Sequence, residues 1–263
     1  MAEACGVPRA QLWLLQEIPN KFLNSFWRQI NLLAQKRIPI SYLLGHQNFM
    51  GLDIKVRPKA TLIPRPETEE LVEKVIQKCR KEFARGSGIS IADVGTGSGC
   101  IILALRQALA DDFLLNLWAN DISPSALKVA RLNDQRTGRQ GPGAPFIHWR
   151  AGSLLTPFPS VITFNVIVAN LPYVRRGDYD NLEPEIRLWE PREALVAGPN
   201  GLALIGRLIT EAGRRLAEGG FLALEFGDGQ LSAIKKILRQ RCFRRVEAFK
   251  DFNRQPRFIM AAK

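Results

Sequence analysis

The stretch Ile89-Ser-Ile-Ala-Asp-Val-Gly-Thr-Gly-Ser-Gly99 decides the fold of this chain. Its first half, from Ile89 to Val94, is short and apolar, as is typical of a buried strand. Three alternating glycines then let the backbone turn tightly and approach a ligand closely. The apolar run at 99–109 that follows predicts a helix. A strand that enters a helix through such a loop indicates an α/β sheet with a ligand site at the loop.

Strand and helix patterns continue to alternate toward the C-terminus. Strands are expected at 114–119, 146–149, 165–169 and 220–226, and helices at 124–133, 202–217 and 231–240, with a surface loop at 137–145. Two closing strands, around 246–249 and 257–261, are expected to be antiparallel. The alternation predicts a parallel, doubly wound sheet with helices on both faces.

The N-terminal part follows other patterns. Apolar residues at helical spacing in 10–36, interrupted near Pro19, predict two short helices. Alternation around Gly51 predicts a hairpin, and Pro66 opens a further helix whose first turn is acidic. We therefore expect three parts: a short helical domain at 1–45, a hairpin linker at 46–65 and an α/β domain at 66–263.

Composition narrows the class of protein. The 263 residues, 46% of them hydrophobic, can bury a sizeable core. We expect a cytoplasmic protein without membrane contact, because no apolar run approaches the roughly 20 residues of a membrane span and the N-terminus does not resemble a secretory signal. A monomer is also expected. The four cysteines and two histidines lack metal-ligand spacing, so no metal is expected. The net charge of +12 indicates attraction to polyanions such as RNA or the ribosome, although solvated basic faces give the same charge.

The glycine loop has the spacing of one kind of cofactor site. Dinucleotide sites use G-x-G-x-x-G, whereas the glycines here alternate, and Cys100 and Ile101 follow where a phosphate-binding loop would have its lysine. S-adenosylmethionine fits better, because its amino, carboxylate and sulfonium groups need polar backbone and acidic neighbours. We expect this cofactor to be bound by Asp93, Gly95, Thr96, Gly97, Ser98 and Gly99.

Two downstream segments extend the predicted cofactor site. Asp121 ends the next predicted strand, where an acid can accept hydrogen bonds from both ribose hydroxyls. Capping of the following helix is the alternative role for Asp121, although Ser123 is the stronger cap candidate. Leu154 follows the next strand, at the place expected for contact with the adenine ring.

Residues 166–173, Val-Ile-Val-Ala-Asn-Leu-Pro-Tyr, end a buried strand in a stiff turn. The Asn170 side-chain oxygen and the Leu171 carbonyl can accept the two N–H bonds of a planar NH₂ group, while Tyr173 forms a wall. This tetrapeptide can also be a simple turn, but open α/β sheets bind ligands at this end of their strands. With the glycine loop, it indicates methyl transfer to a planar nitrogen, with Asn170, Pro172 and Tyr173 as catalytic residues and Asn170 also facing the cofactor.

Five segments carry a family resemblance. They are Leu62-Ile-Pro-Arg-Pro-Glu-Thr-Glu-Glu-Leu-Val72, Asp93-Val-Gly-Thr-Gly-Ser-Gly99, Asn170-Leu-Pro-Tyr173, Leu182-Glu-Pro-Glu-Ile186 with Glu190-Pro-Arg192, and Gly219-Gly-Phe-Leu-Ala-Leu-Glu225. In this order they resemble the peptide chain release factor glutamine methyltransferases, the HemK/PrmC family. The match runs from about Arg37 to Arg257, and Pro-Arg-Pro-Glu-Thr-Glu is its most specific part.

The resemblance implies an N-terminal helical domain that docks the substrate, followed along the chain by a Rossmann-like, seven-stranded class I methyltransferase sheet. It implies methyl transfer from S-adenosylmethionine to the side-chain amide nitrogen of the glutamine in the Gly-Gly-Gln motif of class I release factors, which modulates translation termination. The methionine part of the cofactor would lie at 95–99, its ribose at Asp121 and its adenine at Leu154. The glutamine would lie at 170–173, with Arg65 and Glu67 as further substrate-binding residues.

The chain departs from the family pattern at Leu171, where a Pro is usual, at Ser153, where an Asp is usual, and at Asn165, where an acid is usual. Two other functions stay open. Asn-Leu-Pro-Tyr also resembles the tetrapeptide of ribosomal RNA adenine dimethyltransferases, so an RNA or DNA exocyclic amine is an alternative substrate, although the Pro-Arg-Pro-Glu-Thr-Glu segment argues against it. A noncatalytic, cofactor-binding, ribosome-associated protein is the third hypothesis, which the departures at Leu171 and Ser153 suggest.

Overall fold

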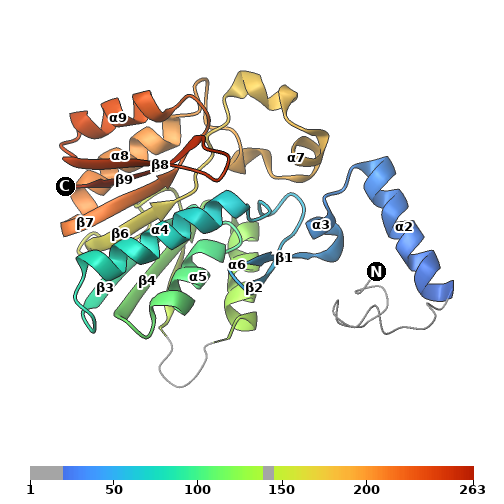
Figure 1. The fold of residues 1–263 in the computed structure, drawn as a ribbon, viewed down its shortest axis with the longest axis horizontal. Helices are drawn as coiled ribbons and strands as arrows, with labels where there is room; N and C mark the ends of the chain where they lie inside the picture. Colours follow the sequence, from blue (N-terminus) through green and yellow to red (C-terminus); the bar gives the residue numbers. More distant parts are fainter. Residues whose placement is uncertain (1–19, 139–144) are drawn as a thin grey trace.

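A computed structural model describes residues 20–138 and 145–263. Its centre is a seven-stranded sheet in the order β5-β4-β3-β6-β7-β9-β8 (Figure 1). The strands are β3 Gly88–Val94, β4 Leu114–Asp121, β5 Ile147–Ala151, β6 Phe164–Ala169, β7 Leu216–Glu225, β8 Arg245–Lys250 and β9 Pro256–Ala262. The five strands from β3 to β7 pair in parallel, and β9 pairs antiparallel with β7 and β8. The predicted strands and the antiparallel closing pair are confirmed.

The order of the strands places a crevice at the centre of the sheet. From β3 the chain moves outward through β4 to β5, and it then returns so that β6 pairs with the other edge of β3. Open α/β sheets bind ligands at such a reversal of direction, outside the carboxyl ends of the strands. The loops after β3, β4 and β6 meet there.

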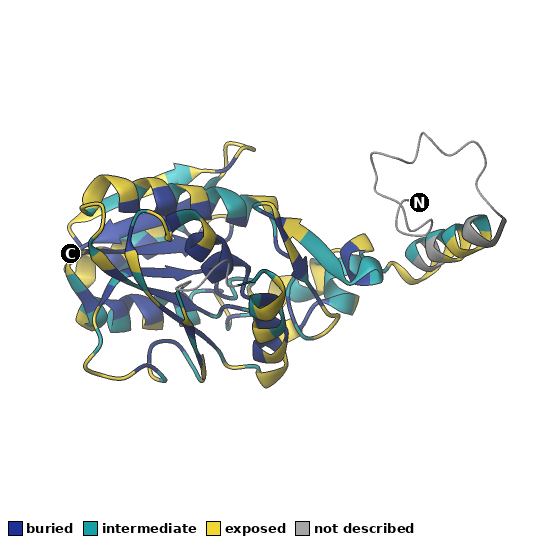
Figure 2. Ribbon diagram, turned by 90° about the horizontal axis from the view of Figure 1, so that it is seen from below, coloured by how far each residue is buried: buried dark blue, intermediate teal, exposed yellow. Residues whose placement is uncertain are grey.

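Helices cover both faces of the sheet and bury two apolar cores (Figure 2). The helices are α4 Pro66–Glu82, α5 Cys100–Leu109, α6 Pro124–Arg136, α8 Ala203–Arg215 and α9 Leu231–Gln240. One core takes side chains such as Leu71 and Ile102 from α4 and α5, and the other takes Leu208 and Ile234 from α8 and α9. Pro66 and Pro124 stand in the first turns of their helices, where the missing N–H of proline leaves no hydrogen bond unmade.

The N-terminal part joins the sheet through a hairpin. Its elements are α2 Asn20–Lys36, α3 Ile40–Leu44, β1 His46–Phe49 and β2 Leu52–Lys55. Phe49 and Ile54 of the hairpin belong to the core that contains Leu71 and Ile102. The Asn133 side chain of α6 also accepts a hydrogen bond from the Lys55 N–H and donates one to the Lys55 carbonyl. Helix α2 projects away from the sheet (Figure 1). The second predicted helix and the hairpin are confirmed, whereas the first predicted helix lies outside the described residues.

Residues 174–201 form turns and one short helix that the sequence patterns did not predict. The segment contains two 3₁₀ turns, Arg176–Asn181 and Arg192–Ala194, and the short helix α7 Pro184–Trp189. Trp189 Nε1 donates to the Lys36 carbonyl at 3.1 Å, and Arg37 pairs with Glu185, so this segment packs beside the end of α2. Among the helices in the described ranges, none is both long and apolar enough to cross a bilayer.

Gly201 lies where a side chain would be poorly tolerated. Its φ is +71°, and a side chain on it would overlap the Tyr173 carbonyl, which accepts a hydrogen bond from Gln230 Nε2 at 2.9 Å. We expect Gly201→Ala to lower the free energy of unfolding by roughly 3 kcal/mol, because backbone strain adds to the steric overlap. Gly219→Ala is the matched control, since φ there is +72° but the space around it is open, so only about 1–2 kcal/mol should be lost. Urea unfolding measures both values, and equal losses would contradict the prediction.

Candidate active site

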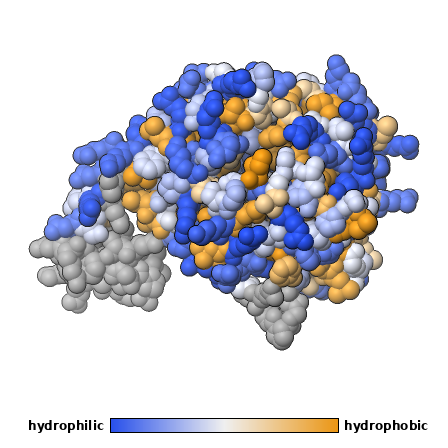
Figure 3. Space-filling model, turned by 180° about the vertical axis from the view of Figure 1, so that it is seen from behind, coloured by the Kyte–Doolittle hydropathy of each residue, from blue (hydrophilic) through white to orange (hydrophobic). Residues whose placement is uncertain are grey.

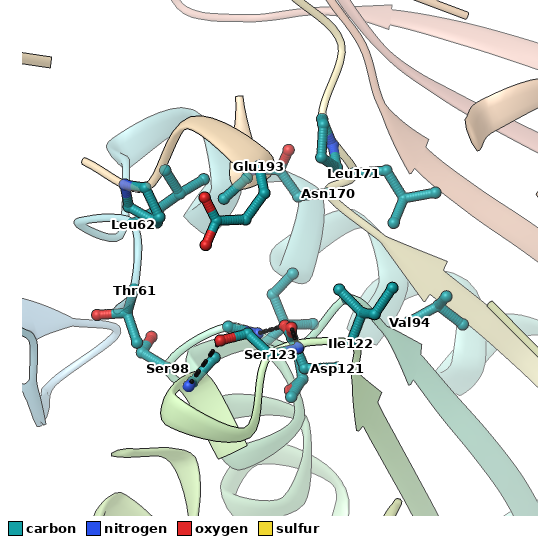
Figure 4. Close-up of a pocket in the computed structure, with 18 of the residues that line it drawn as sticks. Thr61, Leu62, Val94, Ser98, Asp121, Ile122, Ser123, Asn170, Leu171 and Glu193 are labelled. Atoms are coloured by element: carbon teal, nitrogen blue, oxygen red, sulfur yellow. Dashed lines mark hydrogen bonds between the residues drawn. The ribbon is translucent and has the colours of Figure 1, made fainter. Parts of the chain in front are cut away.

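A cavity of about 280 Å³ opens at the carboxyl ends of β3, β4 and β6 (Figure 4). Its wall is formed by segments at 60–65, 94–98, 120–123, 152–154 and 170–172, together with Thr68 and Glu193. Asp121 and Ser123 lie on one side in the close-up, and Leu62, Asn170 and Glu193 lie on the other. The volume is near the lower end of the roughly 300–1,000 Å³ of small-molecule sites. The cavity therefore occupies the position that the strand order predicts for a ligand.

The glycine loop forms the floor of the cavity with backbone that a side chain would obstruct. Gly95, Gly97 and Gly99 all have positive φ. A Cβ on Gly95 would lie 2.8 Å from Leu171 Cδ2, and one on Gly99 would lie 3.2 Å from the Trp149 ring. Gly97 lines the cavity and has open space beside it. The loop thus presents the backbone of Gly95 and Gly97 toward the cavity, whereas Gly99 is turned toward Trp149 and is not a lining residue.

Asp93 supports this loop from below. It is fully buried, and its Oδ2 accepts a hydrogen bond from Thr96 Oγ1 at 2.5 Å. Burial raises the pKa of the Asp93 carboxyl to about 7, against the hydrogen bonds from Thr96 and the Ile102 backbone. Asp93 is not among the residues that line the cavity, so it acts on the loop, while Thr96 and Ser98 line the cavity directly.

Asp121 links the glycine loop to the end of β4. Its two carboxylate oxygens accept from the Gly97 N–H at 2.9 Å and from the Ser123 N–H at 2.8 Å. Burial raises the pKa of Asp121, and the nearby charge of Glu193 acts in the same direction. Ser123 caps α6, because its Oγ accepts from the Ala126 N–H at 3.3 Å. The cap therefore falls on Ser123, and the Asp121 side chain remains at the cavity wall.

Leu154 lies in the cavity wall in a strained conformation. Its φ is +51°, which is uncommon for a residue that carries a side chain. The segment before it is fixed by β4, because Asn120 Nδ2 donates to the Gly152 carbonyl at 2.7 Å and Gly152 N–H donates to the Asp121 carbonyl at 3.0 Å. Ile122 also lines the cavity, and it is 69% exposed although apolar. Leu154 and Ile122 together offer an apolar surface on which a flat ring can lie.

Asn170 is held in a defined orientation at the end of β6. Its Nδ2 donates to Thr68 Oγ1 at 3.1 Å, and no described residue donates to its Oδ1. Leu171 and Pro172 line the cavity beside it, and in the described part of the chain the Leu171 carbonyl accepts no hydrogen bond. Asn170 and Leu171, which both line the cavity, thus each carry an oxygen acceptor to which no described residue donates.

Tyr173 departs from the expectation that its ring forms a wall of this cavity. It is not a lining residue, and its ring lies against Gly227, where a Cβ would be 2.8 Å from Tyr173 Cδ2. Burial raises the pKa of its phenol. The reason is the path of the chain, since the Tyr173 carbonyl is bound by Gln230 and the backbone turns away from the cavity there.

The Pro-Arg-Pro-Glu-Thr-Glu segment contributes to the cavity differently from the prediction. Arg65 lines it and forms an ion pair with the buried Glu190, which ties this segment to residues 184–194. Glu67 does not line the cavity, whereas Thr68 does. Thr68, Ile122 and Glu193 were not predicted as site residues, although Thr68 lies within the motif that marks the family resemblance.

The donor and acceptor set suits S-adenosylmethionine. Bare backbone at Gly97, the Asp121 carboxylate and the apolar surface at Leu154 match the polar, ribose and adenine parts of this molecule. In the described part of the chain, no three histidine, cysteine or acidic side chains gather as metal ligands would. His46 pairs with Asp53, and His148 stacks on Trp118 with 4.2 Å between ring centroids.

The fold defines the class of this protein. A methyltransferase from Pyrococcus furiosus superposes with a TM-score of 0.56 at 21% identity, covering 89% of this chain and 96% of that one. A 16S rRNA methyltransferase of T. thermophilus, in complex with AdoMet and guanosine, superposes with a TM-score of 0.58 at 15% identity, covering 83% of this chain and 49% of that one. The fold is therefore the Rossmann-like fold of class I methyltransferases.

Sequence relatives define the family. The release factor glutamine methyltransferase of Moorella thermoacetica is 36% identical over 261 residues, covering 98% of this chain and 87% of that one. That of Gloeobacter violaceus is 35% identical over 236 residues, covering 88% and 77%. No protein-family model matches the sequence. The chain belongs to the release factor glutamine methyltransferase family.

Proposed function

We propose that this protein transfers a methyl group from S-adenosylmethionine to the side-chain amide nitrogen of the glutamine in the Gly-Gly-Gln motif of class I release factors. One observation carries the proposal. A single cavity brings a methyltransferase-type glycine loop together with two oxygens, Asn170 Oδ1 and Leu171 O, that have no donor within the described residues. A primary amide supplies the two N–H groups that such a pair of acceptors needs.

The residues that would hold the cofactor follow from the cavity wall. Gly95 to Ser98 would bind its amino acid part, Asp121 its ribose hydroxyls, and Leu154 with Ile122 its adenine. The cofactor supplies an electrophilic methyl group on a sulfonium. The carboxylates of Asp121 and Glu193 in the wall favour a ligand of positive charge.

The substrate side of the cavity has to compensate for a weak nucleophile. The lone pair of an amide nitrogen is delocalised, so the nitrogen must be positioned in line with the methyl group and supported as it becomes pyramidal. Asn170 Oδ1 and Leu171 O would do both by accepting its two N–H bonds. The proton is lost after positive charge develops on nitrogen, so a dedicated base is not required.

The N-terminal part of the chain exposes apolar side chains that suit a docking role. We propose that residues 1–45 dock the release factor, that 46–65 connect this part to the catalytic domain at 66–263, and that the protein acts as a cytoplasmic monomer. Trp27 and Ile40 in the N-terminal part and Leu188 of α7 are large apolar side chains that are at least half exposed. Their exposure supports a protein-docking role, since contact with a partner would cover them.

A basic surface supports action close to ribosomal RNA. Residues 231–246, from α9 into β8, contain no acidic residue and six basic ones: Lys235, Lys236, Arg239, Arg241, Arg244 and Arg245. Hydrophilic side chains project from this end of the molecule, opposite α2 (Figure 3). Such a surface attracts a phosphate backbone without reading its sequence.

Charge reversal tests this surface. We expect the triple variant Lys236→Glu, Arg239→Glu, Arg244→Glu to bind RNA more weakly and to lower the slope of log affinity against log salt by about 0.7–0.9 for each phosphate that the protein no longer neutralises. Methylation of an isolated release factor should not change. Lys128→Glu on α6 serves as the control. An unchanged salt slope in the triple variant would rule out this surface.

Labelling tests the proposed function against its alternatives. The protein is incubated with methyl-labelled S-adenosylmethionine and, separately, with a class I release factor or with ribosomal RNA, and the label is located after digestion. We expect it in the peptide that contains Gly-Gly-Gln and not in a release factor whose glutamine is replaced by alanine. Label in adenine would favour a nucleic-acid methyltransferase, and no turnover on either substrate would favour a noncatalytic protein.

A further inference from the structure

We propose that Thr68 and Glu225 are positioning residues that hold the Asn170 amide with its Oδ1 toward the substrate. Resting on the proposed function, this inference adds two side chains that do not touch the reacting atoms. They act through Asn170 alone. The three residues come from separate elements: Thr68 from the first turn of α4, Glu225 from the end of β7, and Asn170 from the residue after β6.

The three side chains form a continuous chain of hydrogen bonds. Thr68 Oγ1 donates to Glu225 Oε2 at 2.8 Å, and Asn170 Nδ2 donates to Thr68 Oγ1 at 3.1 Å. Thr68 and Glu225 are only 3% and 2% exposed, so water does not compete for these bonds. Sheet register fixes the spacing, because Ala169 lies beside Leu224 in the β6–β7 pair and the next residues are Asn170 and Glu225.

Donor and acceptor chemistry fixes which atom donates in each of these hydrogen bonds. An ionised carboxylate can only accept, so the single hydroxyl hydrogen of Thr68 is directed to Glu225. Thr68 Oγ1 can then only accept, and of the two ends of the Asn170 amide only the NH₂ can donate to it. The NH₂ end is thereby kept at Thr68, and Oδ1 is left at the cavity. Without this constraint the two ends of a terminal amide can exchange places by rotation about one bond.

The charge on Glu225 controls the donor–acceptor direction of these hydrogen bonds. Burial raises the pKa of this carboxyl to about 7. The groups that act on it are Thr68 and Glu67 from α4, Asn170 after β6, Arg257 from β9, Tyr173 and Cys100. Arg257 and the bonds from Thr68 and Asn170 favour the ionised form, whereas Glu67 opposes it. A protonated Glu225 can donate a hydrogen bond to Thr68 Oγ1. The Thr68 hydroxyl can then donate to Asn170 Oδ1, and the Asn170 amide can rotate so that its NH₂ end faces the cavity.

The pH dependence follows from this direction. Above about pH 7 Glu225 is ionised and Asn170 Oδ1 faces the cavity. As the pH falls below this value, the donor–acceptor direction of the hydrogen bonds from Glu225 through Thr68 to Asn170 can reverse. Turnover should therefore rise with pH through about 7. Glu225→Gln should remove this step from the profile, because the glutamine does not titrate.

Substitutions at Thr68 separate positioning from general support of the fold. Thr68→Val keeps the shape of the side chain and removes the hydroxyl, and we expect it to lower kcat by roughly 10- to 100-fold, since small misplacement of a reacting group has effects of this size. Cofactor affinity should stay within about threefold. Thr68→Ser restores the hydroxyl and should restore kcat. The matched control is Thr210→Val on α8. It removes a helix hydroxyl that donates to Gly206 O, and Thr210 is not a cavity-lining residue.

A measurement on the protein without ligands tests the inference independently of substrate. The side-chain NH₂ signals of Asn170 are assigned in a ¹⁵N-correlation spectrum by their loss in Asn170→Asp. We expect these signals to shift with pH through about 7 in the native protein, and the shift to vanish in Glu225→Gln and in Thr68→Val. A pH-dependent shift that persists in both variants would overturn the inference whatever the substrate is. A native protein that shows the NMR shift but does not methylate a release factor would instead contradict only the proposed function.

Discussion

Replacement of Asn170 by alanine is expected to lower turnover by about a hundredfold or more, while cofactor affinity falls much less. Asn170 Oδ1 is one of the two acceptors that would hold the amide nitrogen, and loss of one transition-state partner has effects of this size in other enzymes. Its Nδ2 also donates to Thr68 Oγ1 at 3.1 Å and favours the ionised form of Glu225. Single-turnover rates beside calorimetric titration with S-adenosylmethionine measure the two quantities separately.

The control for this variant is Asn116→Ala on the exposed part of β4. The Asn116 side chain bonds Ser90 Oγ and accepts from Trp118 Nε1, so it also loses hydrogen bonds but lies outside the cavity wall. Its turnover should match that of the native protein. Near-normal methylation by Asn170→Ala would refute the role assigned to Asn170.

Replacement of Asp121 by alanine is expected to weaken S-adenosylmethionine binding by roughly 30- to 150-fold, which corresponds to about 2–3 kcal/mol. Two effects add. The carboxylate holds the Gly97 N–H at 2.9 Å and so shapes the floor of the cavity, and it is also the acceptor expected for the ribose hydroxyls. Calorimetric titration with S-adenosylmethionine gives the affinity directly.

Asp111→Ala, in the exposed turn after α5, removes a carboxylate without touching the cavity and should leave the affinity unchanged. Asp121→Asn should fall between native and alanine variants, because one side-chain oxygen still accepts while the charge is lost. A change of less than threefold in Asp121→Ala would mean that the cofactor does not lie over the end of β4.

Much of the fold follows from local sequence patterns. The glycine loop between β3 and α5 and the alternation after it predict the central sheet, because short apolar runs and helical periodicity report burial directly. Asn165, where the family pattern has an acid, has a structural role: its Oδ1 accepts from the Ser90 N–H at 2.8 Å and joins β6 to β3. Residues 176–194 could not be predicted, since their short turns depend on contacts with Lys36, Arg37 and Arg65 that lie far away in sequence.

The site was predictable where its residues stand at strand ends. Asp121 is the last residue of β4 and Asn170 follows β6, and parallel strands bring their carboxyl ends to one edge. Glu225 also ends a strand, but nothing local distinguishes it from a solvated acid, and only the fold brings Thr68 to it. Tyr173 was misplaced for the opposite reason, because its neighbour in sequence lines the cavity while its own ring is drawn toward Gly227.

A structure of this protein with S-adenosylhomocysteine and a Gly-Gly-Gln peptide tests the central claim most directly. We expect the glutamine amide nitrogen within about 3 Å of both Asn170 Oδ1 and Leu171 O, with the thioether sulfur in the same cavity. A glutamine bound elsewhere, or an Asn170 side chain turned away from the sulfur, would contradict the account.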